Sequence, residues 1–196
     1  MTAVTTPPVT LPPGPLALGQ ILHEEPGLRI RGMRRDDHAG LLAVTTDPRV
    51  VRYVADGSVL TPDKVSLWIE NQVGNYARLG YGTFTLADPA DDRAFGWGGF
   101  VPPGPDRRPQ PEIIYGMERA RWGGGLGTRV ARALMRLAFE RFGLQEVVAT
   151  VDGANAASLR ILAGAGFRLD HVEEDAAGPV HVLLADQAGW LAAGGA

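Results

Sequence analysis

The chain contains no cysteine among its 196 residues. No thiol can therefore serve as a covalent nucleophile or form a stabilising disulfide. The sequence also lacks the G-x-S-x-G turn of serine hydrolases and the H-E-x-x-H helix of zinc proteases, and its four histidines, His23, His38, His171 and His181, are scattered. We therefore expect chemistry without a metal and without a covalent enzyme intermediate.

Lysine is nearly absent, since Lys64 is the only lysine among 19 basic residues. The 22 acidic residues give a net charge of −3, so nothing predicts nucleic-acid binding. No apolar run approaches the length of a membrane span. This arginine bias suits a high-GC coding sequence better than any particular function. From the composition we expect neither a nucleic-acid partner nor a membrane partner.

The length and the 45% hydrophobic content are sufficient for one domain with a sizeable core. The first fifteen residues contain five prolines and almost no charge, which is typical of an extended or disordered tail rather than a signal peptide. We expect a proline-rich tail over residues 1–22, one folded domain over 23–190 and a flexible tail over 191–196. Cytoplasmic residence is the expected location.

The most informative segment runs from Trp122 to Phe139, where a cluster of glycines opens directly into an amphipathic helix. A short apolar strand, Ile113 to Met117, precedes it. Glycines allow close approach of backbone N–H groups, and a helix start leaves several of these groups unpaired, so the segment predicts an anion site. The segment does not match a P-loop, because Gly127 stands where that motif needs lysine. It does not match the dinucleotide-binding motif G-x-G-x-x-G either, because Thr128 stands where the last glycine should be. A tight turn without a ligand remains an alternative.

A second segment, from Glu146 to Phe167, indicates a strand, a turn and a capped helix. Val147, Val148 and Val151 supply a β-branched run, and Asn155 can cap the helix that follows. Together the two segments resemble the GNAT superfamily of acetyl-CoA-dependent N-acyltransferases, and within it the ribosomal-protein N-terminal acetyltransferase branch. The resemblance covers roughly residues 27–190.

Two motifs carry the resemblance. The family's pyrophosphate loop falls on Trp122 to Gly127, with matching glycines at Gly125 and Gly127, although Trp122 departs from the usual first residue. The later motif is matched by Asn155, Ser158, Ile161, Gly166 and Phe167. The resemblance implies an α/β (α+β) fold with a single mixed, mostly antiparallel sheet of about seven strands flanked by helices. A V-shaped opening is expected between the fourth and fifth of these strands, Glu112 to Met117 and Glu146 to Val151.

The resemblance also implies acetyl-CoA as cosubstrate, with the pantetheine arm in that opening and no metal. The residues expected to contact it are Met117, Glu118, Arg119, Trp122, Gly123, Gly124, Gly125, Leu126, Gly127, Thr128, Asn155 and Ser158. Arg121 is a further cation expected near the pyrophosphate.

Attack of an amine on a thioester needs a base, an oxyanion site and a proton donor. In the resemblance Glu112 occupies the position of the base, Ser158 lies near the sulfur, and Asn155 reaches the pantetheine amide or a nearby water. Glu112 equally fits an ordinary residue at a strand start, Ser158 a first-turn helix residue, and Asn155 a helix cap in either case. The oxyanion is expected to meet a main-chain N–H around Met117.

The acceptor is an amine, either a protein N-terminal α-amine or a small amino compound. Arg52, Tyr53, Trp68, Tyr81 and Trp97 are candidates to line its pocket, and each also fits ordinary core packing. A non-catalytic acyl-CoA sensor or regulatory domain is the alternative function, and Glu112 and Ser158 favour an enzyme over it. The oligomeric state is a monomer or a homodimer.

Overall fold

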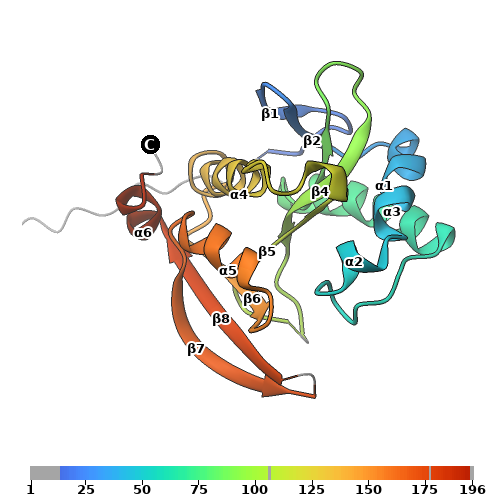
Figure 1. Ribbon diagram of the computed structural model, residues 1–196. Coiled ribbons are helices and arrows are strands. Elements are labelled where there is room, and N and C mark those ends of the chain that lie inside the picture. The colour runs from blue at the N-terminus through green and yellow to red at the C-terminus, as the bar shows by residue number, and fades with distance from the viewer. Residues whose placement is uncertain (1–13, 106, 177, 195–196) are drawn as a thin grey trace, which may run out of the picture.

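The computed structural model describes residues 14–105, 107–176 and 178–194 (Figure 1). The expected tails lie partly outside these residues, at 1–13 and 195–196. Eight strands form one sheet: β1 (Ile21–Glu25), β2 (Leu28–Gly32), β3 (Thr83–Ala87), β4 (Ala94–Val101), β5 (Glu112–Met117), β6 (Glu146–Asp152), β7 (Arg168–Asp175) and β8 (Gly178–Asp186).

Helices flank this sheet on both sides. They are α1 (His38–Thr45), α2 (Pro48–Val51), α3 (Pro62–Leu79), α4 (Leu126–Arg136), α5 (Ala156–Ala163) and α6 (Gln187–Ala192), with short helical turns η1 (Arg35–Asp37), η2 (Arg119–Arg121) and η3 (Leu137–Arg141). Among the described residues, none of these helices combines the length and the apolar character needed to cross a membrane.

The sheet order is β1-β2-β3-β4-β5-β6-β8-β7. Every neighbouring pair is antiparallel except β5 and β6, which are parallel. The expected mixed, mostly antiparallel sheet is confirmed, but it has eight strands rather than about seven. The additional strand is β1, which begins inside the stretch expected to be tail and forms a hairpin with β2 around Gly27, whose φ is +76°. A half-exposed edge strand needs little apolar alternation, so its sequence gives a weak signal.

The opening between β5 and β6 is confirmed. Their only register pair is Glu112 with Val148, at the beginning of β5. The backbone N–H of Val148 also donates to the Pro111 carbonyl at 3.0 Å. The whole of β5 pairs with β4, and the whole of β6 pairs with β8. The half of the sheet that ends at β5 and the half that begins at β6 are therefore joined only near Glu112 and separate beyond it.

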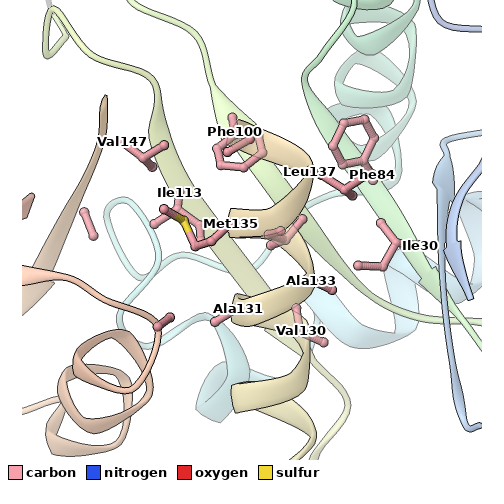
Figure 2. Close-up of a cluster of buried hydrophobic side chains, with 14 of the residues drawn as sticks. Ile30, Phe84, Phe100, Ile113, Val130, Ala131, Ala133, Met135, Leu137 and Val147 are labelled. Atoms are coloured by element: carbon pink, nitrogen blue, oxygen red, sulfur yellow. The ribbon is translucent and has the colours of Figure 1, made fainter. Parts of the chain in front are cut away.

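The larger hydrophobic core lies between α4 and the sheet. Val130, Leu134 and Met135 of α4 are completely buried, and Phe84 and Phe100 meet the helix from β3 and β4 (Figure 2). This packing fixes the start of α4 relative to the end of β5. A second cluster joins α1, α2 and α3 to Trp97 of β4 and thereby places α2 beside β5.

The chain after β2 does not enter α1 directly. A 3₁₀ turn, η1, covers residues 35–37, and α1 begins at His38 and continues to Thr45. Asp37 is the reason, because its carboxylate accepts hydrogen bonds from the buried Arg31 side chain and from the Arg34 backbone N–H, at 2.7–2.8 Å. Thr61 caps the start of α3 by accepting from the Lys64 N–H, and Pro62 lies in the first turn.

Candidate active site

A cleft of about 870 Å³ lies over the separation of β5 and β6. Its walls come from the segment 49–55 around α2 on one side and from α5 on the other, and Figure 1 shows these two elements on opposite sides of β5. The glycine loop between η2 and α4 also lines it. The opening in the sheet, the loop and both walls therefore form one continuous cleft.

The glycine loop has the backbone conformation that its sequence predicts. Gly123 and Gly125 have φ of +81° and +78°, a left-handed conformation that favours glycine, and Gly125 is the N-cap of α4. A Cβ on Gly123, Gly124 or Gly125 would meet no atom within 4 Å, so this side of the loop faces open space. Among the described residues, the backbone N–H groups of 123–127 find no main-chain acceptor. The loop therefore presents free donors and the positive end of an eleven-residue helix to the cleft.

Gly127 brings the loop close to the opposite wall. A Cβ at this position would lie 2.8 Å from Cδ1 of Ile161 on α5. Thr128 also lines the cleft, whereas Leu126 is buried in the main core and supports the loop from behind. The first turn of α4 is thus fixed between the core and α5.

The side chains that precede the loop divide into exposed and paired groups. The Trp122 indole N–H donates to the Met117 carbonyl at 2.9 Å, and this ring is half exposed. Arg119 is exposed, with its guanidinium 6.0 Å from that ring, and the structure shows no ion pair for it among the described residues. Glu118 lies off the cleft lining, between Arg93 and Arg121.

Glu112 lies at the point where β5 and β6 separate. Its Oε1 atom accepts hydrogen bonds from the Thr150 backbone N–H, at 3.3 Å, and from the Thr150 hydroxyl. Both residues line the cleft. Thr150 therefore holds one carboxylate oxygen, and the structure shows no partner for Oε2 among the described residues.

Ser158 and Asn155 lie at the start of α5. The Asn155 side-chain oxygen accepts from the Ser158 N–H at 3.2 Å, so the expected helix cap is present. Both side chains line the cleft. Their position places a hydroxyl at the N-terminal end of a helix, across the cleft from α2.

Tyr115 of β5 is a cleft residue that sequence reasoning missed. Its hydroxyl is buried and completes no hydrogen bond with the described residues. Burial raises the pKa of this hydroxyl, and the nearby Ser158 hydroxyl opposes that rise. A buried hydroxyl without a partner is costly and therefore unusual, so Tyr115 offers a donor to whatever enters the cleft.

The sequence matches the family described as the acetyltransferase (GNAT) domain over residues 27–168. The protein belongs to the GNAT acetyltransferase family. The cleft is the candidate active site of this GNAT domain.

Relatives agree with this assignment. FsC-acetyl coenzyme A-N(2)-transacetylase of Aspergillus fumigatus is 32% identical over 136 residues, which are 65% of this chain and 55% of that protein, little more than half its length. Ribosomal-protein-S5-alanine acetyltransferase of Vibrio fischeri has a TM-score of 0.73 and 15% identity, covering 87% of this chain and 98% of the other. Spermidine N-acetyltransferase of Vibrio cholerae, solved with CoA and spermine, has a TM-score of 0.71 and 15% identity, covering 84% and 98%. The two structures show the shared fold.

The acceptor candidates of this GNAT domain are only partly brought together. Arg52, Tyr53 and Trp97 line the cleft. Trp68 does not, because it packs edge-on against Trp97 at a centroid distance of 5.7 Å, on the α3 side. Tyr81 also lies elsewhere, in the main core against Phe100 and Phe142, so its burial reflects packing.

The lining includes three further polar residues that were not among the candidates from the sequence: Arg49, Thr150 and Arg160. Strand alternation could have identified Thr150, because it is exposed between the buried residues Ala149 and Val151 of β6. Arg49 and Arg160 reach the cleft through tertiary packing of α2 and α5, which sequence spacing does not reveal.

Proposed function

We propose that the protein transfers an acetyl group from acetyl-CoA directly to a primary amine. The observation that carries the proposal is the separation of β5 and β6 beside a left-handed glycine loop, with the carboxylate of Glu112 and the hydroxyls of Tyr115 and Ser158 on the lining of the same cleft. The fold and the family supply the acyltransferase class, and these residues support the chemistry.

The residues present fit CoA. The glycine loop offers free N–H groups to a pyrophosphate, and the exposed Arg119 adds a cation beside them. The edges of β5 and β6 that face each other beyond Glu112 offer main-chain partners to an extended amide-containing chain, because no strand from the described residues fills the gap. Asn155 and Ser158 lie on the wall beside that gap.

The reaction requires defined proton transfers. When bound, acetyl-CoA supplies a thioester whose carbonyl carbon accepts the amine nitrogen, with formation of a C–N bond and loss of the C–S bond. We assign removal of the ammonium proton to Oε2 of Glu112, directly or through one water, since Oε1 is held by Thr150. Backbone N–H groups near Met117 would stabilise the carbonyl oxygen as negative charge develops.

The departing sulfur must also gain a proton. Ser158 is a weak acid on its own, but Tyr115 lies beside it with an unused hydroxyl. We propose that Tyr115 and Ser158 together donate to the sulfur as it leaves. Because the chain has no cysteine, transfer within a ternary complex is the economical route.

The acceptor is proposed to be a protein N-terminal α-amine or a small amino compound. The similarity to a ribosomal-protein acetyltransferase and to a spermidine acetyltransferase includes both kinds, at 15% identity in each case. Fold alone does not select between them, because functions differ among members of one fold.

Calorimetric titration with acetyl-CoA, beside ATP and NADH, tests the cosubstrate. We expect saturable binding of acetyl-CoA alone, lost in Gly125→Glu, because this change puts a carboxylate and a Cβ at a position with φ of +78°. A folded protein that binds no acetyl-CoA would contradict the proposal.

Glu112→Gln tests the base. Glutamine keeps an oxygen that can accept from Thr150, so we expect retained acetyl-CoA binding and a fall in turnover of about 100-fold or more, the usual contribution of a general base. Glu140→Gln is the matched control, because Glu140 is exposed in η3 and off the cleft lining. Unchanged turnover in Glu112→Gln would remove Glu112 from the mechanism, and acetyl-CoA binding by the wild type without turnover on any amine would favour a sensor domain.

A further inference from the structure

The charges on the cleft lining are strongly one-sided. Glu112 is the only acidic residue on the part of the lining that the structure describes. Five arginines line the same cleft: Arg49, Arg52, Arg119, Arg121 and Arg160. In a chain with a net charge of −3, this cationic lining is a local feature of the site.

The single carboxylate is already engaged. One Glu112 oxygen is held by Thr150, and the proposed function uses the other for the reacting amine. No further carboxylate is left on the described lining for a second ammonium group. A polyamine would therefore bring additional positive charge into a cleft lined by cations, which is unfavourable.

The arginines differ in how far they are neutralised. Arg121 is paired with Asp88 at 2.7 Å and with Glu118 at 3.0 Å, and Arg49 is paired with Asp47 at 3.2 Å. Arg52, Arg119 and Arg160 have no ion pair within the described ranges of the chain. Arg119 follows β5 and lies beside Trp122 of the glycine loop, where a phosphate of the cosubstrate would supply its counter-charge.

Arg52 lies on a different wall. It follows α2, and its guanidinium lies 5.0 Å from the centroid of the Tyr53 ring. The turn that holds it is closed by a hydrogen bond from the Val54 N–H to the Val51 carbonyl at 2.8 Å, and Ala55 has an unusual φ of +49°. An exposed guanidinium against an aromatic ring presents its remaining donors to the cleft, in a planar arrangement that suits a carboxylate.

We propose that the acceptor amine carries an anionic group of the carboxylate type, and that Arg52 binds it. This inference rests on the proposed transfer reaction and names the substrate class of that cleft. The amine faces Glu112 while the carboxylate faces the α2 wall. Such an acceptor has two sources, a free amino acid or a peptide with an acidic N-terminal residue.

The test compares acceptors that differ only in charge. One pair is alanine and alaninamide, and the second is an amidated peptide beginning with Glu and the same peptide beginning with Gln; spermidine is the cationic probe. CoA release is measured for each, with rates expressed per concentration of free amine. In one of the two pairs, we expect kcat/KM to be roughly tenfold higher for the member that carries the carboxylate, which corresponds to the contribution of one charge-assisted hydrogen bond. A preference in the first pair would identify a free amino acid as the acceptor, and a preference in the second pair would identify an acidic peptide.

Three arginine variants assign the effect. Arg52→Gln should remove the difference within the pair, and Arg52→Glu should invert it, while both retain the acetyl-CoA affinity of the wild type. Arg141→Gln removes the same charge outside the cleft and should leave the preference unchanged. The inference would be overturned if kcat/KM for the neutral amines or for spermidine equalled or exceeded that for the acidic acceptors. It would also be overturned if Arg52→Gln lost acetyl-CoA binding but kept the preference for the acidic acceptor. Failure of the wild type to bind acetyl-CoA would instead contradict the proposed function.

Discussion

Gly125→Ala tests whether the left-handed glycine loop is the cosubstrate site. Gly125 has φ of +78°, and alanine in this conformation costs about 1–2 kcal/mol. A Cβ at this position meets no atom within 4 Å, so the cost is backbone strain rather than a clash. This free energy must appear either in folding or in binding.

The two possibilities have distinct readouts. If packing of α4 holds the loop in place, the strain lowers the melting temperature by about 2–8 °C in a protein of this size, with the affinity for acetyl-CoA unchanged. If the loop relaxes in the free protein, acetyl-CoA must restore it, and the Kd rises about 5- to 30-fold. Calorimetric titration and thermal unfolding of the same samples measure both quantities.

Gly124→Ala is the matched control. Gly124 also has open space around its Cβ direction, but its φ is not positive, so alanine is allowed there without strain. We expect it to change the melting temperature and the Kd only slightly. If Gly125→Ala and Gly124→Ala behave alike in both measurements, the reasoning from the left-handed conformation is refuted.

Three further predictions follow from particular contacts. Tyr115→Phe should lower kcat about tenfold or more, because it removes the proposed proton donor. Thermal stability should be unchanged, because the buried hydroxyl has no hydrogen-bond partner among the described residues. Unchanged kcat would exclude Tyr115 as a donor. Trp122→Phe keeps an aromatic ring but frees the Met117 carbonyl, so the KM for acetyl-CoA should change more than kcat; an effect on kcat alone would contradict this. Burial alone would raise the pKa of Asp92, but hydrogen bonds from Arg29 and Arg31 outweigh it and lower that pKa to about 2. Asp92 therefore stabilises the fold at pH values above its ordinary pKa of 3.8, and this contribution, at most about 2 kcal/mol given its partial exposure, is lost as the pH falls towards 2. Denaturant unfolding of the wild type and of Asp92→Asn between pH 5 and pH 2 should show that the difference between their free energies of unfolding shrinks. A difference that stays constant over this range would refute the prediction.

The central strands could be predicted because their signals are local. The strands at Thr83–Ala87 and Glu112–Met117 combine apolar or β-branched residues with flanking turn residues, and α3 carries its own cap at Thr61. β1 was missed because its sequence, ILHEE, lacks such a signal. This strand depends on pairing with β2, which is a tertiary interaction.

Residue type alone did not identify the acceptor wall. Trp97 and Trp68 contact one another, yet only Trp97 lines the cleft. Tyr81 was a candidate and lies in the core, whereas Tyr115 was not and lies on the cleft lining, with a hydroxyl that has no hydrogen-bond partner in the described part of the chain. Trp97 and Tyr115 lie on the central strands β4 and β5, whereas Trp68 lies on α3 and Tyr81 precedes β3. An aromatic residue's type does not show which of these elements lines the cleft.

The two halves of the cleft therefore differ in how they are encoded. The glycine loop acts through consecutive main-chain groups at the start of one helix, so a few contiguous residues determine it. The proposed acceptor half joins Glu112 to Thr150, 38 positions later, and sets both opposite the Arg52 turn. This turn reaches them through the packing of α2 against β5. Substitutions in segment 49–55 should then alter the choice of amine without altering the cosubstrate site. In the proposed arrangement, the segments that would select the acceptor are separate in sequence from the glycine loop that would bind the cosubstrate.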